Sequence, residues 1–157
     1  MRRPLACLLV CLGPLLVGCG GDSQPAVDTP PAPTEVRHEL DPLTSRFPDL
    51  GTPVSASWVT WNSAGPNDDR SIPGPTTYWI DAVVHLDPDT TTKLVAQYLP
   101  IPGSEQPDVQ ELLRTELPPG PYLTSVTLDL AFTTPELATH AYLDPMADVL
   151  VLGSTQL

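Results

Sequence analysis

The side chains best suited to acid–base catalysis are carboxyl groups in the middle of the chain. Asp68 and Asp69 lie in the Gly- and Pro-rich stretch 63–75, and Asp81 lies in the β-rich stretch 76–86 that follows. Two carboxyl groups within about 10 Å across a cleft can act as an acid and base pair in hydrolysis. The stretch 63–75 lacks the Asp-x-Asp-x-Asp-Gly frame of an EF-hand, which favours a polar loop over a calcium site.

Two tryptophans on either side of this loop, Trp61 and Trp79, form a second set of candidates. Successive side chains of a strand point to opposite faces, so these residues and their neighbours Trp58 and Tyr78 are divided between two faces of a sheet. An exposed tryptophan would offer a flat contact surface for a sugar or a protein, unless another element covers it. The possible ligand surface therefore consists of Trp61, Asp68, Asp69, Trp79 and Asp81.

Known catalytic motifs are absent from the sequence. It has no G-x-S-x-G, S-x-x-K or H-E-x-x-H motif and no phosphate-binding glycine loop. Asp81 and His85 share one face of a strand, but at ~3.3 Å per residue their Cα atoms lie roughly 13 Å apart, too far to share a metal ion. We therefore predict no catalytic residue, no metal site and no cofactor, and the sequence favours a binding protein over an enzyme.

The N-terminus has the layout of an export signal. Arg2 and Arg3 precede the apolar stretch 5–17, whose thirteen residues would span roughly 20 Å as a helix, short of the ~30 Å bilayer core. All three cysteines lie within the first nineteen residues, so no disulfide framework is expected in the folded part. We predict a cleaved signal rather than a membrane-spanning helix.

Residues 16–19, LVGC, resemble the lipobox of bacterial lipoproteins. The resemblance implies that residues 1–18 are a signal peptide and that the sulfur of Cys19 carries a diacylglyceryl group, with acyl chains such as palmitate. Two acyl chains hold a protein durably on a bilayer, where one holds it only marginally. We therefore expect a protein anchored to the cell membrane on its extracytoplasmic side. The Sec or Tat export route and the number of acyl chains stay open.

The charge of the chain is strongly negative, with 7 basic and 19 acidic residues and a net charge of −12. Loss of the signal peptide removes two arginines, leaving 5 basic residues against 19 acidic ones, a net charge near −14. Nucleic-acid binding depends on neutralising phosphates, so a nucleic-acid partner is excluded. The acidity favours solubility outside the cell, with a basic partner or weakly bound Ca²⁺ as the alternative.

Composition divides the mature chain into two parts. Residues 19–36 are rich in Gly, Ser and Pro and poor in large apolar residues, so they are predicted to form a disordered tether. Residues 37–157 are enough for one hydrophobic core and are predicted to form a single domain.

Apolar alternation predicts four strands, at 54–62, 76–86, 139–144 and 149–154. In 76–86 the core face carries Tyr78, Ile80, Ala82, Val84 and Leu86. The other face is half polar, which indicates a sheet with one partly open face. Asp144 and Pro145 suit a turn between the last two strands.

Helical spacing predicts a short turn at 41–46 and two longer helices, at 88–99 with Asp87 as N-cap and at 108–117. Residues 125–132 fit both a strand and a short helix capped by Ser125, and this choice stays open. The predicted fold is α+β, a small antiparallel sheet with two helices packed on one face.

The stretches RFPDLGTPVSASWV and PGPTTYWIDAVVHLDPDT resemble small lipoproteins of high-GC Gram-positive bacteria. This resemblance implies no activity and no catalytic residues. We expect a lipid-anchored, non-enzymatic binding or interaction module with an envelope protein or polymer as partner. The alternatives are an envelope hydrolase that uses Asp81 with Asp68 or Asp69, and a structural accessory subunit of a membrane complex.

Overall fold

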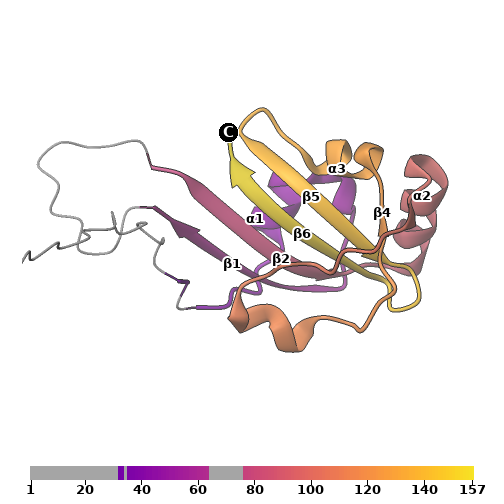
Figure 1. Cartoon of the computed structure of the whole chain (residues 1–157), viewed down its shortest axis with the longest axis horizontal. Helices are drawn as coiled ribbons and strands as arrows, with labels where there is room; N and C mark the ends of the chain where they lie inside the picture. The colour runs from indigo at the N-terminus through magenta and orange to yellow at the C-terminus, as the bar shows by residue number, and fades with distance from the viewer. Residues whose placement is uncertain (1–31, 34, 64–75) are drawn as a thin grey trace, which may run out of the picture.

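A single antiparallel sheet organises the part of the chain that the structure, a computed structural model, describes: residues 32–33, 35–63 and 76–157. Its strand order is β1-β2-β6-β5-β4-β3 (Figure 1). The strands are β1 (Ser55–Asn62), β2 (Tyr78–His85), β3 (Ile101–Pro102), β4 (Leu123–Thr124), β5 (Leu137–Asp144) and β6 (Val149–Gln156). The predicted signal peptide, Cys19, most of the predicted tether, Asp68 and Asp69 lie outside the described residues.

The chain also forms helices, and helices combined with an antiparallel sheet confirm the α+β class. They are α1 (Asp41–Arg46), α2 (Pro88–Tyr98) and α3 (Val126–Phe132), with the 3-10 helices η1 (Pro48–Leu50) and η2 (Glu111–Glu116). Helix α2 begins as predicted: the Asp87 carboxylate accepts a hydrogen bond of 2.9 Å from the backbone N–H of Asp89, and Pro88 occupies the first turn.

Two long hairpins, β1–β2 and β5–β6, make up the centre of the sheet and confirm the four predicted strands. They join through antiparallel pairing of β2 with β6. In the second hairpin the Asp144 carboxylate accepts hydrogen bonds from the backbone N–H groups of Met146 and Ala147, at 3.0 and 3.1 Å. Asp148 then takes a left-handed φ of 53°, which an aspartate tolerates. This turn sets the register that places residues of β5 opposite those of β6.

The two faces of the sheet are covered differently. We call the side that bears Ile80, Ala82 and Val84 the helix face, and the side that bears Trp79, Asp81 and Val83 the open face. Apolar side chains of all three α-helices bury against the helix face: Leu43, Leu94, Leu128 and Phe132. In Figure 1 the segment 103–117 crosses the strands on the opposite side, over the open face.

The prediction that both longer helices pack on one face is wrong. Helix α2 packs on the helix face, whereas Val109 and Leu113, from the second predicted helix, pack on Val59 and Val83 of the open face. The second helix is also shorter than the predicted 108–117 and is a 3-10 helix. Gln110 stays extended, at φ −54° and ψ 145°, because its N–H donates to a carboxylate of the sheet and not to a helix.

Residues 125–132, for which the sequence fits both a strand and a helix, form a helix. Ser125 is the N-cap of α3, and its hydroxyl accepts a hydrogen bond of 3.0 Å from the N–H of Leu128. The helix in turn supplies acceptors to the outer edge of β5: Asp129 accepts from the N–H of Ala141 at 2.8 Å, and Thr133 accepts from the N–H of Thr139 at 3.1 Å. Side chains thus satisfy donors that a neighbouring strand would otherwise pair.

Substitutions at Leu128 and Leu130 test this helix. Leu128 is fully buried and Leu130 is 63 % exposed, although a strand would place both on one face. We expect Leu128→Ala to lower the free energy of unfolding by ~2–5 kcal/mol and Leu130→Ala to change it by less than ~0.5 kcal/mol. Chemical denaturation measures both, and equal losses at the two positions would contradict the helix.

Candidate functional site

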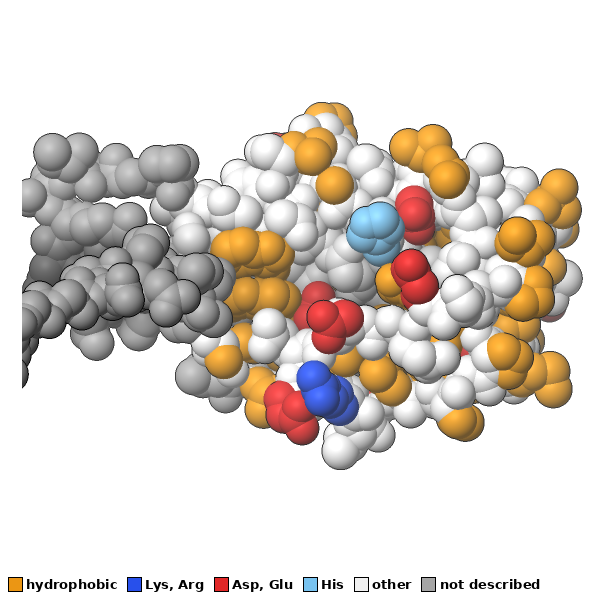
Figure 2. All heavy atoms as spheres, viewed as in Figure 1, with side chains coloured by type: hydrophobic (Ala, Val, Ile, Leu, Met, Phe, Trp, Pro, Cys, Tyr) orange, Lys and Arg blue, Asp and Glu red, His pale blue; other side chains and the backbone are white. Residues whose placement is uncertain are grey.

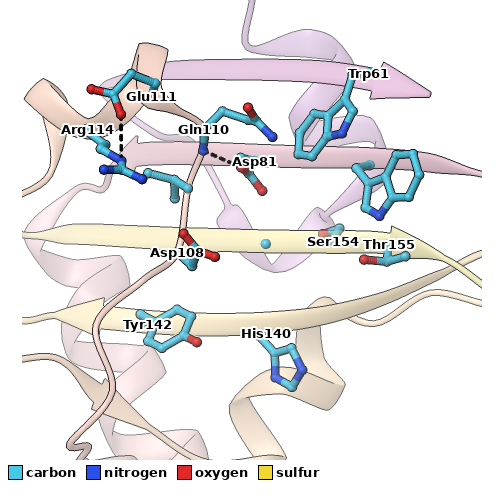
Figure 3. Close-up of a pocket in the computed structure, with 13 residues that line it drawn as sticks. Trp61, Asp81, Asp108, Gln110, Glu111, Arg114, His140, Tyr142, Ser154 and Thr155 are labelled. Atoms are coloured by element: carbon cyan, nitrogen blue, oxygen red, sulfur yellow. Dashed lines mark hydrogen bonds and ion pairs between the residues drawn. The ribbon is translucent and has the colours of Figure 1, made fainter. Parts of the chain in front are cut away.

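A hollow of about 520 Å³ opens on the open face, beside residues 103–117, which cross this face and which we call the covering segment. Figure 2 shows acidic side chains gathered around a histidine near the centre of this face, with a basic side chain below them. Residues from β1, β2, β5, β6 and the covering segment line the hollow, among them Trp61, Trp79, Asp81, Asp108, His140 and Tyr142 (Figure 3).

Three residues of one cross-strand row, Asp81, Gly153 and His140, form the floor of the hollow. Antiparallel register places Val59, Asp81, Gly153 and His140 side by side on four neighbouring strands. Gly153 adds no side chain to this row, and a Cβ atom built there would lie 3.8 Å from Oδ1 of Asp81. The glycine therefore leaves space directly beside the Asp81 carboxylate.

Trp61 and Trp79 form one wall of the hollow. They are paired residues of β1 and β2, and their rings stack with centroids 5.8 Å apart and planes 14° apart. Both are half-buried, whereas Trp58 is buried on the helix face and donates its indole N–H to the backbone oxygen of Glu39 at 3.0 Å. Stacking holds the two rings in a fixed orientation, so the wall is flat and apolar.

Asp81 lies at the centre of the site and is only 6 % exposed. Its Oδ2 accepts a hydrogen bond of 2.8 Å from the backbone N–H of Gln110. Burial raises the pKa of Asp81 from its ordinary value of 3.8 to about 6; the Gln110 hydrogen bond opposes this rise, and the negative charge of Asp108 adds to it. The carboxyl group therefore changes its charge near neutral pH.

Apolar anchors hold the covering segment in place around this hydrogen bond. Val109 and Leu113, on either side of Gln110, are buried against the valines of the open face. Further along, Tyr122 is buried, donates its hydroxyl hydrogen to the backbone oxygen of Pro118, and meets Tyr142 edge to face at 6.3 Å. Asp81 therefore receives its hydrogen bond from a backbone that is fixed at both ends.

The charged rim of the hollow is mostly acidic. Arg114 pairs with Glu111 at 3.1 Å, and both side chains are exposed. His140 lies 3.3 Å from Asp129. The two basic side chains that line the hollow thus already face acidic partners, which leaves Asp81 and Asp108 as its further carboxyl groups.

Three of the five residues predicted as a ligand surface meet in this hollow: Trp61, Trp79 and Asp81. Asp68 and Asp69 lie outside the described residues. His85 pairs with Ser55 and Val149 near the other end of β2, and it does not line the hollow.

Sequence reasoning missed the residues that complete the hollow, chiefly Asp108, Gly153 and Tyr142. Only the register of β6 and β5, and the path of the covering segment, bring them to Asp81. Within residues 35–63 and 76–157 there is no group of three His, Cys, Asp or Glu side chains placed to hold a metal ion.

The buried carboxyl group makes stability depend on pH in a definite direction. Because its pKa is raised in the folded state, the stabilising preference for protonated Asp81 is complete below pH 3.8 and is lost as the pH rises through about 6. Asn keeps the acceptor for Gln110 without the charge. We expect Asp81→Asn to gain roughly 2 kcal/mol relative to the wild type between pH 4 and pH 7.5, because most of the pKa shift from 3.8 to about 6 is titrated in that range. Urea unfolding at both pH values measures this, and a constant difference would contradict a raised pKa.

Comparison with known proteins finds no family model, curated sequence or solved structure that matches this chain. Among the helices of the described residues, none has the length and apolar content needed to cross a bilayer.

Proposed function

We propose that this protein is a lipid-anchored envelope protein whose domain binds a ligand in the hollow on its open face. The observation that carries the proposal is the placement of a stacked tryptophan pair, Trp61 and Trp79, beside the buried carboxyl group of Asp81. A flat apolar wall next to a few oriented polar groups is the usual make-up of a ligand site.

Rigid support favours binding in this hollow. Trp61, Trp79 and Asp81 belong to the first hairpin, whose strands are paired along their full length. Asp81 is further oriented by the Gln110 hydrogen bond. A site held in place before the ligand arrives loses less conformational entropy on binding.

Photo-crosslinking tests the location of the site. A benzophenone amino acid at Thr155, an exposed residue that lines the hollow opposite Trp79, should give a discrete adduct in intact cells that produce the protein. The matched control is the same amino acid at Ala96, an exposed position on α2. Identical adducts from both positions, or none from Thr155, would contradict binding in the hollow.

The N-terminal sequence supports the anchor, since Arg2, Arg3, the apolar stretch and LVGC at 16–19 agree in order and length. We expect the wild-type protein to sediment with membranes and to incorporate labelled palmitate. Cys19→Ala removes the acceptor sulfur, so label should be lost and the protein left unprocessed or released. Cys11→Ala, within the apolar stretch, is the control and should be labelled like the wild type. Labelling of Cys19→Ala would exclude the anchor.

A hydrolase is the second candidate, favoured by one observation. The pKa of Asp81, raised to about 6 by burial, suits a general acid, and Asp108 lies near enough to add to that rise. The two candidates differ in what Asp81→Asn does: it would remove turnover in a hydrolase, whereas a binding module has no turnover to lose.

A further inference from the structure

We propose that the hollow binds a cationic nitrogen group, a guanidinium or an alkylammonium, with the adjoining part of the ligand against Trp61 and Trp79. This inference rests on the proposed function and names the chemistry of its ligand. A basic side chain of a protein partner and a free amine share this chemistry.

The free oxygen of Asp81 points to a hydrogen-bond donor. Oδ2 is occupied by the N–H of Gln110, whereas Oδ1 accepts no hydrogen bond from the described residues. That oxygen lies toward the bare position of Gly153, inside the hollow. A nearly buried carboxylate with an open acceptor is best matched by a donor that also carries positive charge.

The charge of the site favours a cation over a neutral group. Of the ion pairs among the described residues, none includes Asp81 or Asp108, while Arg114 and His140 each have an acidic partner. No basic side chain of the described residues therefore neutralises the centre of the hollow. A bound cation would supply the missing charge beside a carboxylate that is only 6 % exposed, where Coulomb attraction is stronger than in bulk water.

The tryptophan rings would also attract a cation, because the faces of aromatic rings carry partial negative charge. The chain already uses this contact elsewhere, since the guanidinium of Arg37 lies 4.6 Å from the ring centre of Trp58. A calcium ion fits the hollow less well than an organic cation, because it takes six to eight oxygen ligands. The described residues hold no such cluster.

Binding of this kind should weaken as Asp81 takes up a proton. The titratable and charged groups around it are Asp108, Glu111, Arg114, His140 and Tyr142. Burial raises the pKa of Tyr142, so its hydroxyl stays neutral through the range tested. Because several groups line the hollow, an Asp81 variant is needed to assign the loss of affinity to Asp81.

The test compares two probes that differ in charge and little in shape, N-acetyl-arginine amide and N-acetyl-citrulline amide, with N-acetylglucosamine as a neutral sugar. The full chain in a non-ionic detergent is titrated at pH 7.5, and its three tryptophan indole N–H resonances are followed by NMR. The arginine probe should shift the resonances of Trp61 and Trp79 and leave that of buried Trp58 in place. The citrulline probe should bind at least ~10-fold more weakly.

Variants assign the effect to the hollow. Asp81→Asn should weaken the arginine probe about 10-fold and abolish its loss of affinity between pH 7.5 and pH 5. Glu116→Gln, which changes the net charge equally at an exposed residue of η2, should bind like the wild type. Gly153→Val should block binding of the arginine probe, because its side chain fills the floor of the hollow. If Asp81→Asn fails to fold, this variant tests whether the probe binds in the hollow.

Equal affinity for arginine and citrulline, or binding of the sugar alone, would overturn the cation assignment and leave the hollow as a ligand site. No shift of Trp61 or Trp79 with any probe would also overturn it, and crosslinking from position 155 then decides separately whether the hollow binds anything. If the arginine probe binds, a protein-sized adduct from position 155 indicates a basic side chain as the natural ligand, and its absence indicates a free amine.

Discussion

The hydrogen bond from the backbone N–H of Gln110 to the buried carboxylate of Asp81 is the contact on which the open face depends. It ties the covering segment to β2, a strand paired on both sides. A carboxylate at this depth requires a donor, and an extended Gln110 supplies one at the cost of the first turn of the predicted helix. Val109 and Leu113, on either side of Gln110, are buried against the open face. The hollow lies beside the covering segment, where the open face is left uncovered.

The sheet thus has two faces with different compositions and different roles. The buried core of the helix face is mostly apolar and packs against three helices, with one buried polar pair, Thr139 and Ser154, that is hydrogen-bonded at 2.9 Å. The open face interrupts its valines with an acid, a glycine and two tryptophans in a small area. Such a departure from an apolar pattern weakens the core, and it supports the proposal that this surface binds a ligand.

Local signals made much of the fold predictable from the sequence. The alternation in β2, the Asp87 and Pro88 start of α2, and the Asp144 turn each depend on a few neighbouring residues, and each is confirmed. The segment 108–117 was predicted less well because its conformation follows from Asp81, a residue far away in sequence. The apolar residues of 125–132 fit both a strand and a helix, and the helix is favoured by contacts distant in sequence: Leu128 and Phe132 bury in the core, and Asp129 and Thr133 accept hydrogen bonds from β5.

The site could be predicted in part for the same reason. Tryptophans and an acid in two adjacent strands indicated a ligand surface, since a hairpin brings neighbours in sequence together. Gly153 and Asp108 carry no signal of their own, because a glycine in a strand and an exposed acid are both common. Their importance comes from the register of β6 against β2 and from the path of the segment over the sheet.

The proposed binding depends on the ionisation of Asp81, and the chemical shift of its carboxyl ¹³C resonance reports that ionisation directly. A pH titration of the ¹³C-labelled full chain should show a midpoint near 6 in the free protein. The midpoint should fall when the hollow is saturated with N-acetyl-arginine amide, because a bound cation stabilises the carboxylate. A midpoint near the ordinary value of 3.8, unchanged by the arginine probe, would contradict both the buried acid and its role in binding.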